Sequence, residues 1–402
     1  MAHFHLCWEI GAGLGHAGRL KILALALLGR GHRVTMSLRD LPHTHAVLAD
    51  LDIPKLQAPF WMHRTAGMPA NQSSLAEILL SVGYLEAREL TGMVEGWRSL
   101  YRLLQPDLIV ADYAPTAILA ARSMGLRSAS VGLGFYSPPQ GMALPCLRDW
   151  ENIPPQRLQA AEARVLQTAN AVLAQAGAAP FALAAELILG DVPLLCTWPE
   201  LDHYGRPAAS ATWHGPNFLP QAGLAPKWPP GDGPKVFAYL RMQHAEHADV
   251  LAALVRQGCR VLCYLPEVAG GRAPPVTAPN IIYARRPLSL NDVFSEAQLC
   301  VNHGGEATLV QALLAGVPVL LAPIQLEQFL MARRVQAMGA GINAAQAGQP
   351  ADWDRLLRLL LDNPSYAQAA RAFAARHQDF NQERMAEELA DIFERNVTPA
   401  AI

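Results

Sequence analysis

The sequence predicts an α/β protein built from two domains, each with a parallel β-sheet covered by helices. A chain of 402 residues is longer than one ordinary hydrophobic core accommodates. Short apolar strands alternate with amphipathic helices in the first third of the chain, and the alternation starts again after about residue 234. This pattern is typical of parallel sheets, whose strands are connected by helices. Ligands are expected at the carboxyl ends of the strands.

The first domain is expected over residues 1–222, followed by a Pro/Gly-rich linker over residues 223–234. The glycines that follow the first predicted helix are the usual stop at a helix C-terminus. The predicted strands are 4–10, 32–38, 108–111 and 128–132, and the predicted helices are 17–28 and 116–124.

The second domain is expected over residues 235–380. Residues 352–396 are expected to form consecutive helices with one break at Asn363-Pro364, and the segment 381–402 is expected to return to the first domain as a helix. The predicted strands are 236–240, 260–265, 281–283, 299–302 and 318–321, and the predicted helices are 248–257 and 305–315.

The charge balance argues against whole classes of partner. The chain has 32 basic and 34 acidic side chains, so it lacks the electrostatic signature of a protein that binds nucleic acid or an anionic membrane. The N-terminus lacks the basic start and apolar run of a signal peptide. The uncharged runs 166–185 and 307–326 contain Gly and Pro, which predicts no membrane span. We therefore expect a cytoplasmic protein.

The six cysteines are scattered and mostly flanked by apolar residues. None forms a C-x-x-C pair, which favours buried thiols in a reducing compartment. Cys259 and Cys263 lie four apart on a predicted strand, where that offset gives no shared ligand geometry. We expect no metal site.

Residues 299–328, LCVNHGGEATLVQALLAGVPVLLAPIQLEQ, predict a binding site for a diphosphate. A strand ends at Asn302, His303 and two glycines turn the chain, and a helix begins with its free N–H groups and positive dipole end outward. Thr308 and Gln311 share one face of that helix with Gly304. A His-Gly-Gly sequence alone is as readily an ordinary tight turn, but the ordered series favours a site.

The segment from about 281 to 343 resembles the nucleotide-sugar-binding half of inverting family 1 glycosyltransferases, in particular the bacterial macrolide-type members. The matching motifs are HGGEATLVQALLAGVP, PIQLEQ and GAG at residues 339–341. The resemblance implies the GT-B fold, in which two Rossmann-like domains face each other across a cleft. It also implies a metal-independent enzyme without a cofactor that takes a nucleoside diphosphate sugar as co-substrate.

The resemblance also assigns donor-binding roles residue by residue. It implies that the diphosphate is held by His303, Gly304, Gly305 and Thr308, the ribose by Gln311, and the transferred sugar by Glu327 and Gln328.

Several positions depart from the pattern of the family. Gln311 replaces a ribose-binding Glu, and Glu306 lies beside the phosphate turn, where small or apolar residues are usual. In the stretch RRPLS, Arg285 replaces the aromatic residue of the base-binding stretch, and Arg286 is a further donor-binding candidate. Arg241 in YLRMQ replaces a small Gly-Ser turn and is either a phosphate clamp or a solvated loop charge.

The segment WEIGAGLGHAGR, residues 8–19, supports two interpretations. Gly13, Gly15 and Gly18 have the G-x-G-x-x-G spacing of a dinucleotide site, but His16 lies within the motif. Transfer of a glycosyl group to a hydroxyl needs a general base, which is most often His oriented by a carboxylate. Asp112, at the end of a predicted strand, is the expected partner of His16, and this pair also resembles the N-terminal pattern of the family.

Simpler structural roles are open for both residues. His16 could be a turn residue that caps the following helix, and Asp112 could be an N-cap or Asx-turn residue. Aromatic residues of the first domain suggest a small lipophilic or aromatic acceptor, although aromatic side chains more often belong to the core. The candidates are Trp61, Phe135 and Tyr136, together with Phe60, Met62 and Trp97.

The favoured function is inverting transfer of a sugar from a UDP- or TDP-type donor to a hydroxyl of a small lipophilic acceptor. A non-catalytic relative is one alternative, because Glu306, Gln311 and Arg241 depart from the pattern. An NAD(P)-dependent oxidoreductase is a second, motivated by the glycine spacing and by Asp40, which follows Gly18 by 22 residues. A nucleotide-sugar epimerase with the same donor site is a third.

Overall fold

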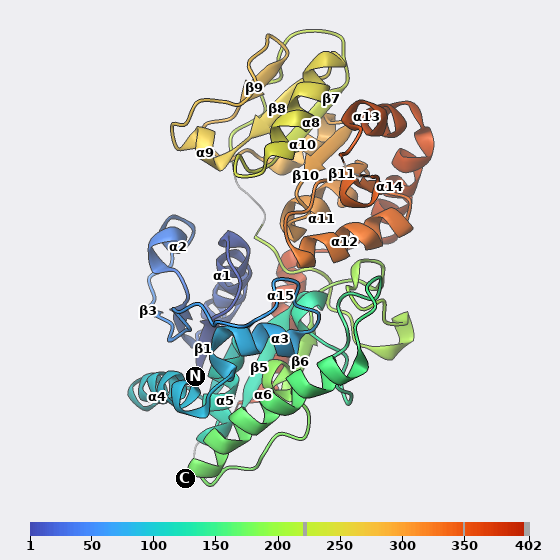
Figure 1. Cartoon of the computed structure of the whole chain (residues 1–402). Coiled ribbons are helices and arrows are strands. Elements are labelled where there is room, and N and C mark those ends of the chain that lie inside the picture. Colours follow the sequence, from blue (N-terminus) through green and yellow to red (C-terminus); the bar gives the residue numbers. More distant parts are fainter. Residues whose placement is uncertain (220–222, 349, 398–402) are drawn as a thin grey trace. The chain divides into compact units, whose positions relative to one another are not determined.

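The structure is a computed structural model that describes residues 1–219, 223–348 and 350–397. The chain divides into two compact units, whose elements are labelled in Figure 1. The stretch expected to be a linker, as far as it is described, belongs to the second unit, where Leu224 pairs with Leu288. The first unit contains residues 1–199, 206–217 and 381–402, and the second contains residues 200–205 and 218–380.

The first unit contains a six-stranded parallel sheet with the order β3-β2-β1-β4-β5-β6. β1 and β4 are buried along their whole length, as expected for parallel strands covered on both faces. The two lie side by side at the point where the strand order reverses, which is where α/β folds bind ligands. The strands are β1 (His3–Trp8), β2 (Arg33–Leu38), β3 (Lys55–Gln57), β4 (Leu108–Asp112), β5 (Ser128–Gly132) and β6 (Val192–Leu195).

The last helix of the chain, α15, packs on the first one, α1. Arg30, at the end of α1, donates hydrogen bonds to Glu387 at 2.7 Å and Asp391 at 2.6 Å. The helices of the first unit are α1 (Leu14–Gly29), α2 (Leu41–Leu48), α3 (Leu75–Leu79), α4 (Ala87–Leu104), α5 (Pro115–Ser123), α6 (Pro155–Gln175), α7 (Glu186–Leu189) and α15 (Gln382–Arg395).

The second unit repeats the strand order of the first, as β12-β11-β10-β7-β8-β9, and all of its strand pairs are parallel. The strands are β7 (Lys235–Tyr239), β8 (Arg260–Tyr264), β9 (Ile281–Tyr283), β10 (Leu299–Asn302), β11 (Val319–Leu321) and β12 (Gly341–Asn343). The helices are α8 (Ala245–Arg256), α9 (Pro266–Ala269), α10 (Leu290–Glu296), α11 (Glu306–Leu314), α12 (Leu326–Ala337), α13 (Trp353–Asp362) and α14 (Pro364–Arg376).

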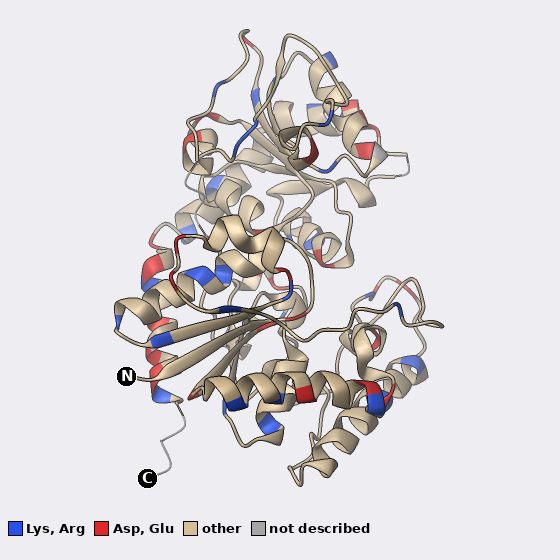
Figure 2. Ribbon diagram, turned by 90° about the vertical axis from the view of Figure 1, so that its left-hand side faces the viewer, with Lys and Arg blue, Asp and Glu red and all other residues tan. Residues whose placement is uncertain are grey.

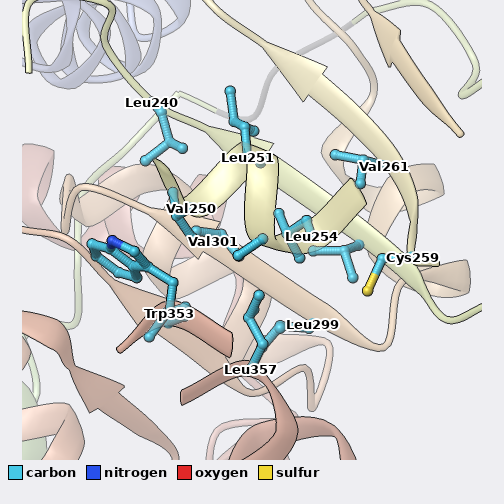
Figure 3. Close-up of a cluster of buried hydrophobic side chains, with 14 of the residues drawn as sticks. Leu240, Val250, Leu251, Leu254, Cys259, Val261, Leu299, Val301, Trp353 and Leu357 are labelled. Atoms are coloured by element: carbon cyan, nitrogen blue, oxygen red, sulfur yellow. The ribbon is translucent and has the colours of Figure 1, made fainter. Parts of the chain in front are cut away.

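One layer of the second core is shown in Figure 3. Leu254 on α8, Val261 on β8 and Leu299 on β10 are buried in the same cluster as Trp353 and Leu357 on α13. Helices from distant parts of the sequence therefore cover this sheet and keep its strands out of water.

The predicted alternation of strands and helices is confirmed in both units, with two corrections. α1 starts at Leu14 rather than at residue 17, because Gly13 at φ 99° starts the helix earlier. The C-terminal helices have a second break between α14 and α15, where the side chain of Asn381 accepts a hydrogen bond from the backbone of Arg384 and begins a new helix.

Figure 2 shows that both acidic and basic residues are distributed over each of the two units. Among the described residues, no helix is both long and apolar enough to span a membrane.

A buried glutamate anchors the beginning of α5. The side chain of Glu9 follows β1 and accepts hydrogen bonds from the backbone N–H of Thr116 at 2.8 Å and from the Thr116 hydroxyl at 2.5 Å. No side chain within α5 caps this end of the helix, so Glu9 supplies the missing acceptor. Burial raises the pKa of Glu9 to about 7.

We expect this carboxyl group to make folding stability depend on pH. Because its folded pKa lies above that of an exposed glutamate, its contribution is full below about pH 4.5 and is lost as the pH rises through about 7. Between about pH 4.5 and pH 7, the free energy of unfolding of the wild type should fall by on the order of 3 kcal/mol relative to that of Glu9→Gln. Urea unfolding at a series of pH values measures this difference. Glu86→Gln, at an exposed ion pair with Arg164, is the control and should keep the wild-type pH dependence.

Candidate active site

The structure brings His16 and Asp112 together at the centre of the first sheet. His16 lies in the first turn of α1, directly after β1, and Asp112 is the last residue of β4. β1 and β4 pair with Trp8 opposite Asp112, and His16 Nδ1 lies 3.1 Å from Asp112 Oδ2. The interpretation of His16 as a capping turn residue is wrong, because it lies inside the helix and caps nothing. Asp112 does not cap α5, whose N-cap position is Ala114.

Asp112 is fully buried, and three side chains hydrogen-bond to it. Arg19 Nη1 lies 3.2 Å from Oδ1 and 3.0 Å from Oδ2, and the Tyr136 hydroxyl donates to Oδ1 at 2.7 Å. Burial alone would raise the pKa of Asp112, but the positive charge of Arg19 and the contact with His16 outweigh burial and hold the pKa below its usual value. The carboxylate is therefore ionised and can only accept hydrogen bonds.

This network fixes the chemistry of the imidazole. Because Asp112 only accepts, Nδ1 of His16 must carry the proton, and in the neutral ring the lone pair lies on Nε2. The ring of Trp8 stacks on that of His16, with centroids 5.0 Å apart and an interplanar angle of 14°. His16 therefore has the tautomer and the rigid placement that a general base requires.

Two residues close to the His16–Asp112 pair, Tyr113 and Gly11, have a positive φ. Tyr113, which directly follows Asp112, has φ 48°, a strained value for a residue other than glycine, and its ring stacks on Tyr136 at 4.4 Å. Gly11 has φ 88°, and a Cβ atom on it would lie 2.6 Å from His16 Nε2. Only glycine leaves room for the imidazole in its present position.

We therefore expect Gly11→Ala to displace His16. The positive φ should cost about 1–2 kcal/mol of stability, and the methyl group should break the hydrogen bond from Nδ1 to Asp112. The downfield Nδ1–H signal of His16 in the proton NMR spectrum should then disappear.

The matched control is Gly31→Ala. This glycine also has a positive φ, 78°, but a Cβ atom there would meet no other atom within 4 Å. Gly31→Ala should therefore lose similar stability and keep the signal. Retention of the signal in Gly11→Ala would contradict the steric explanation.

The second unit presents a polar turn at the equivalent place in its own sheet. Asn302 ends β10 beside Tyr239 at the end of β7, and its side-chain oxygen accepts a hydrogen bond from the backbone N–H of Gly304 at 2.7 Å. Gly304 has φ 90°, and Gly305 is the N-cap residue of α11. The side chain of His303 is buried, and neither ring nitrogen has a hydrogen-bond partner among the described residues.

Arg241 gathers at this turn with the rings of Tyr239 and His303. Its guanidinium lies 5.9 Å from the ring centroid of Tyr239, which lies 5.1 Å from that of His303. His247 holds the loop in place: its Nδ1 lies 3.0 Å from the Arg241 backbone nitrogen, and its Nε2 lies 3.2 Å from the Ala322 carbonyl oxygen. Burial, and then the positive charge of Arg241, lower the pKa of His303 to about 4, so this imidazole is neutral near pH 7.

Thr308 and Gln311 lie on α11, as the spacing predicts, and both are buried. The Gln311 amide donates to the Ala307 carbonyl one turn earlier, at 2.8 Å. Its side-chain oxygen and the second N–H of its amide are left to contact a ligand hydroxyl.

The residues expected to hold the sugar lie at the beginning of a helix. Glu327 and Gln328 are in the first turn of α12. The structure does bring Gln328 to the turn, because a Cβ atom on Gly304 would lie 3.1 Å from Gln328 Cβ. Gln328 Oε1 accepts a hydrogen bond from the Ile324 backbone at 3.0 Å. Arg286 is exposed and makes no hydrogen bond or ion pair within the described parts of the chain.

The aromatic residues expected to line an acceptor pocket separate into different environments. Trp97 is a core residue, fully buried 6.0 Å from the ring of Tyr101, so its proposed place in a pocket is corrected. Trp61 is half-buried in the loop before α3. Phe135 and Tyr136 are buried in the helical turn after β5, where the Tyr136 hydroxyl bonds to Asp112.

Sequence reasoning missed Arg19, Glu9 and Tyr113. Arg19 had a usable signal, since His and Arg three residues apart on a helix share one face. Asp40, which motivated a dinucleotide site, is instead the N-cap of α2 and accepts from the backbone of His43. The described residues contain no group of three or more His, Cys, Asp or Glu side chains placed to hold a metal ion.

Comparison with known families gives a match that spans most of the second unit and continues into α15. Residues 249–392 match the family model described as "Erythromycin biosynthesis protein CIII-like, C-terminal domain". The resemblance of the second half to macrolide-type glycosyltransferases is thereby confirmed.

Curated relatives match over parts of the chain. The elloramycin glycosyltransferase ElmGT of Streptomyces olivaceus is 32% identical over 135 residues, which are 29% of this chain and 33% of that protein. The PGL/p-HBAD biosynthesis rhamnosyltransferase of Mycobacterium tuberculosis is 31% identical over 159 residues, which are 38% of this chain and 34% of that protein. The matched segments thus span about a third of each relative.

Solved structures match over nearly the whole chain. The glycosyltransferase VinC in complex with DTDP has a TM-score of 0.68 at 18% identity and covers 98% of this chain and 100% of its own. The spinosyn rhamnosyltransferase SpnG complexed with thymidine diphosphate has a TM-score of 0.66 at 16% identity, with 97% and 99% covered. The expected GT-B fold is confirmed.

Proposed function

We propose that the protein transfers a sugar from a nucleoside diphosphate sugar to a hydroxyl of a small lipophilic acceptor, with inversion at the anomeric carbon. The observation that carries the proposal is the 3.1 Å contact between His16 Nδ1 and the buried, ionised Asp112. An oriented imidazole with its lone pair on Nε2 is the group that deprotonation of an attacking hydroxyl requires.

The proposed reaction is a single displacement at the anomeric carbon. The acceptor oxygen forms a bond to the anomeric carbon while its proton passes to His16 Nε2. The bond from the anomeric carbon to the diphosphate oxygen breaks, and its electron pair leaves with the diphosphate. Asp112 stabilises the imidazolium that forms and is not itself protonated.

The turn before α11 is the proposed seat of the donor diphosphate. The N-terminus of α11 offers backbone N–H groups and a positive dipole end, and Arg241 adds a full positive charge nearby. His303, neutral near pH 7 and without a hydrogen-bond partner, supplies a buried N–H donor for a phosphate oxygen. Thr308, Gln311, Glu327 and Gln328 are proposed to contact the rest of the donor, and Arg286 is a more remote candidate.

The donor nucleotide is proposed to be TDP or UDP. The complexes of VinC with DTDP and of SpnG with thymidine diphosphate support thymidine, since both share the fold of this chain. Trp61 and Phe135 remain the candidates for contact with a lipophilic acceptor.

We expect His16→Ala to lower the rate of sugar transfer by at least about a thousandfold, because the general base is lost. TDP affinity should stay within about twofold of the wild type, since His16 lies outside the second unit. The measurements are product formation from TDP-sugars with a panel of lipophilic alcohols and phenols, and calorimetric titration of TDP. NMR of the product should show the inverted anomer; turnover by His16→Ala at the wild-type rate contradicts the mechanism.

We expect His303→Ala to weaken TDP binding by roughly tenfold to a hundredfold, the value of one hydrogen bond to a charged group. Isothermal calorimetry measures the change. His5→Ala is the matched control: His5 is equally buried in the first unit, and its Nε2 also has no partner among the described residues. This control should reduce stability and leave TDP affinity unchanged. Equal affinities of His303→Ala and the wild type would remove His303 from the donor site.

A further inference from the structure

Arg19 is a buried arginine that contacts Asp112, the proposed partner of the general base His16, and also the backbone carbonyl of Asn217. We propose that Arg19 is a positioning residue for His16, which fixes the Asp112 carboxylate and shares its charge so that His16 releases its proton at a lower pH. This inference rests on the proposed function, because it assigns a task to a residue that touches Asp112 rather than substrate.

The geometry places one nitrogen of Arg19 against the whole pair. His16 and Arg19 are three residues apart on α1 and therefore project from the same face. Nη1 of Arg19 contacts both Asp112 oxygens, at 3.2 and 3.0 Å, and lies 2.6 Å from the Tyr136 hydroxyl oxygen. Tyr136 in turn donates to Asp112 Oδ1, so the carboxylate is held from three directions with no freedom to rotate away from His16.

The other end of the guanidinium is anchored to the backbone. Nε of Arg19 donates to the Asn217 carbonyl oxygen at 3.2 Å, and Asn217 is the last residue of the first unit before the chain enters the second. Arg19 is only 3% exposed. Its planar guanidinium is held by Asn217 on one side and by Asp112 on the other. A lysine could supply the charge but could not make both contacts in this geometry.

The electrostatic consequence has a definite sign. A buried carboxylate without a second cation would hold a proton on the His16–Asp112 pair up to a higher pH, because that proton would supply the only compensating charge. Arg19 supplies the charge permanently, so the pair releases its proton at a lower pH.

The test is the pH profile of Arg19→Met, which keeps an unbranched, largely apolar side chain and removes the guanidinium and its charge. We expect the acidic limb of the kcat profile to move to higher pH by about one unit or more, the usual effect of one nearby charge. At neutral pH, kcat should fall by at most about tenfold for each unit by which the limb moves, while the KM for the donor and the affinity for TDP stay near wild type.

Arg157→Met is the matched control. It removes an arginine of the same unit whose partner is the mostly buried carboxylate of Glu77, at 2.6 Å. This variant should lose stability without moving the acidic limb. An equal shift in Arg157→Met, or no shift in Arg19→Met, would overturn the inference.

A second measurement does not depend on activity. In the NMR pH titration of the His16 ring signals, assigned by their loss in His16→Asn, the midpoint should move to higher pH in Arg19→Met. If Arg19→Met does not fold, Arg19→Lys replaces it and should show a smaller shift in the same direction, and an unchanged midpoint would overturn the inference. A wild type that folds but transfers no sugar would overturn the proposed function instead, and the ring titration would still decide the role of Arg19.

Discussion

Both sheets depend on the pairing of their first and fourth strands, β1 with β4 and β7 with β10. Each pair joins segments far apart in sequence at the point where the order of the strands reverses. The loops after the two strands lead in opposite directions, which leaves a crevice at the carboxyl ends of the strands. His16 and Asp112 occupy this point in the first unit, and Arg241 and His303 occupy it in the second. The order of the strands therefore determines where these polar residues lie in each unit.

Burying Asp112 there is costly unless its charge is matched, and the surrounding residues meet that requirement together. Arg19 supplies the countercharge, Tyr136 and His16 supply hydrogen bonds, and Glu9 fixes the start of the helix that follows Asp112. The strained φ of Tyr113 is retained because its ring stacks on Tyr136 and its carbonyl accepts from Ile10. The geometry of the His16–Asp112 pair and the stability of the fold thus depend on the same few contacts.

The sequence predicted those elements whose residue types match the local backbone geometry they adopt. The turn before α11 could be predicted because His303 and two glycines stand between an apolar strand and an apolar helix, and the alternation of strands and helices predicted both sheets. The edge strand β9 was predicted, but the edge strands β3, β6 and β12 were missed. β3, for example, consists of Lys55, Leu56 and Gln57 and has no apolar pattern. Tyr136 and Arg19 are 117 residues apart, and nothing local to either predicts that both would meet Asp112. The start of α1 was misplaced because the glycines before it suggested a loop.

The path of the chain constrains how such a protein could be recombined. The polypeptide passes between the two units after residues 199, 205, 217 and 380, and α15 belongs to the unit that contains α1. A hybrid made by joining two relatives at a single crossover would give the first unit a foreign α15 and replace the partners of Arg30. Exchange of donor halves between homologues, in nature or by design, would therefore need a discontinuous graft that leaves α15 with its original α1.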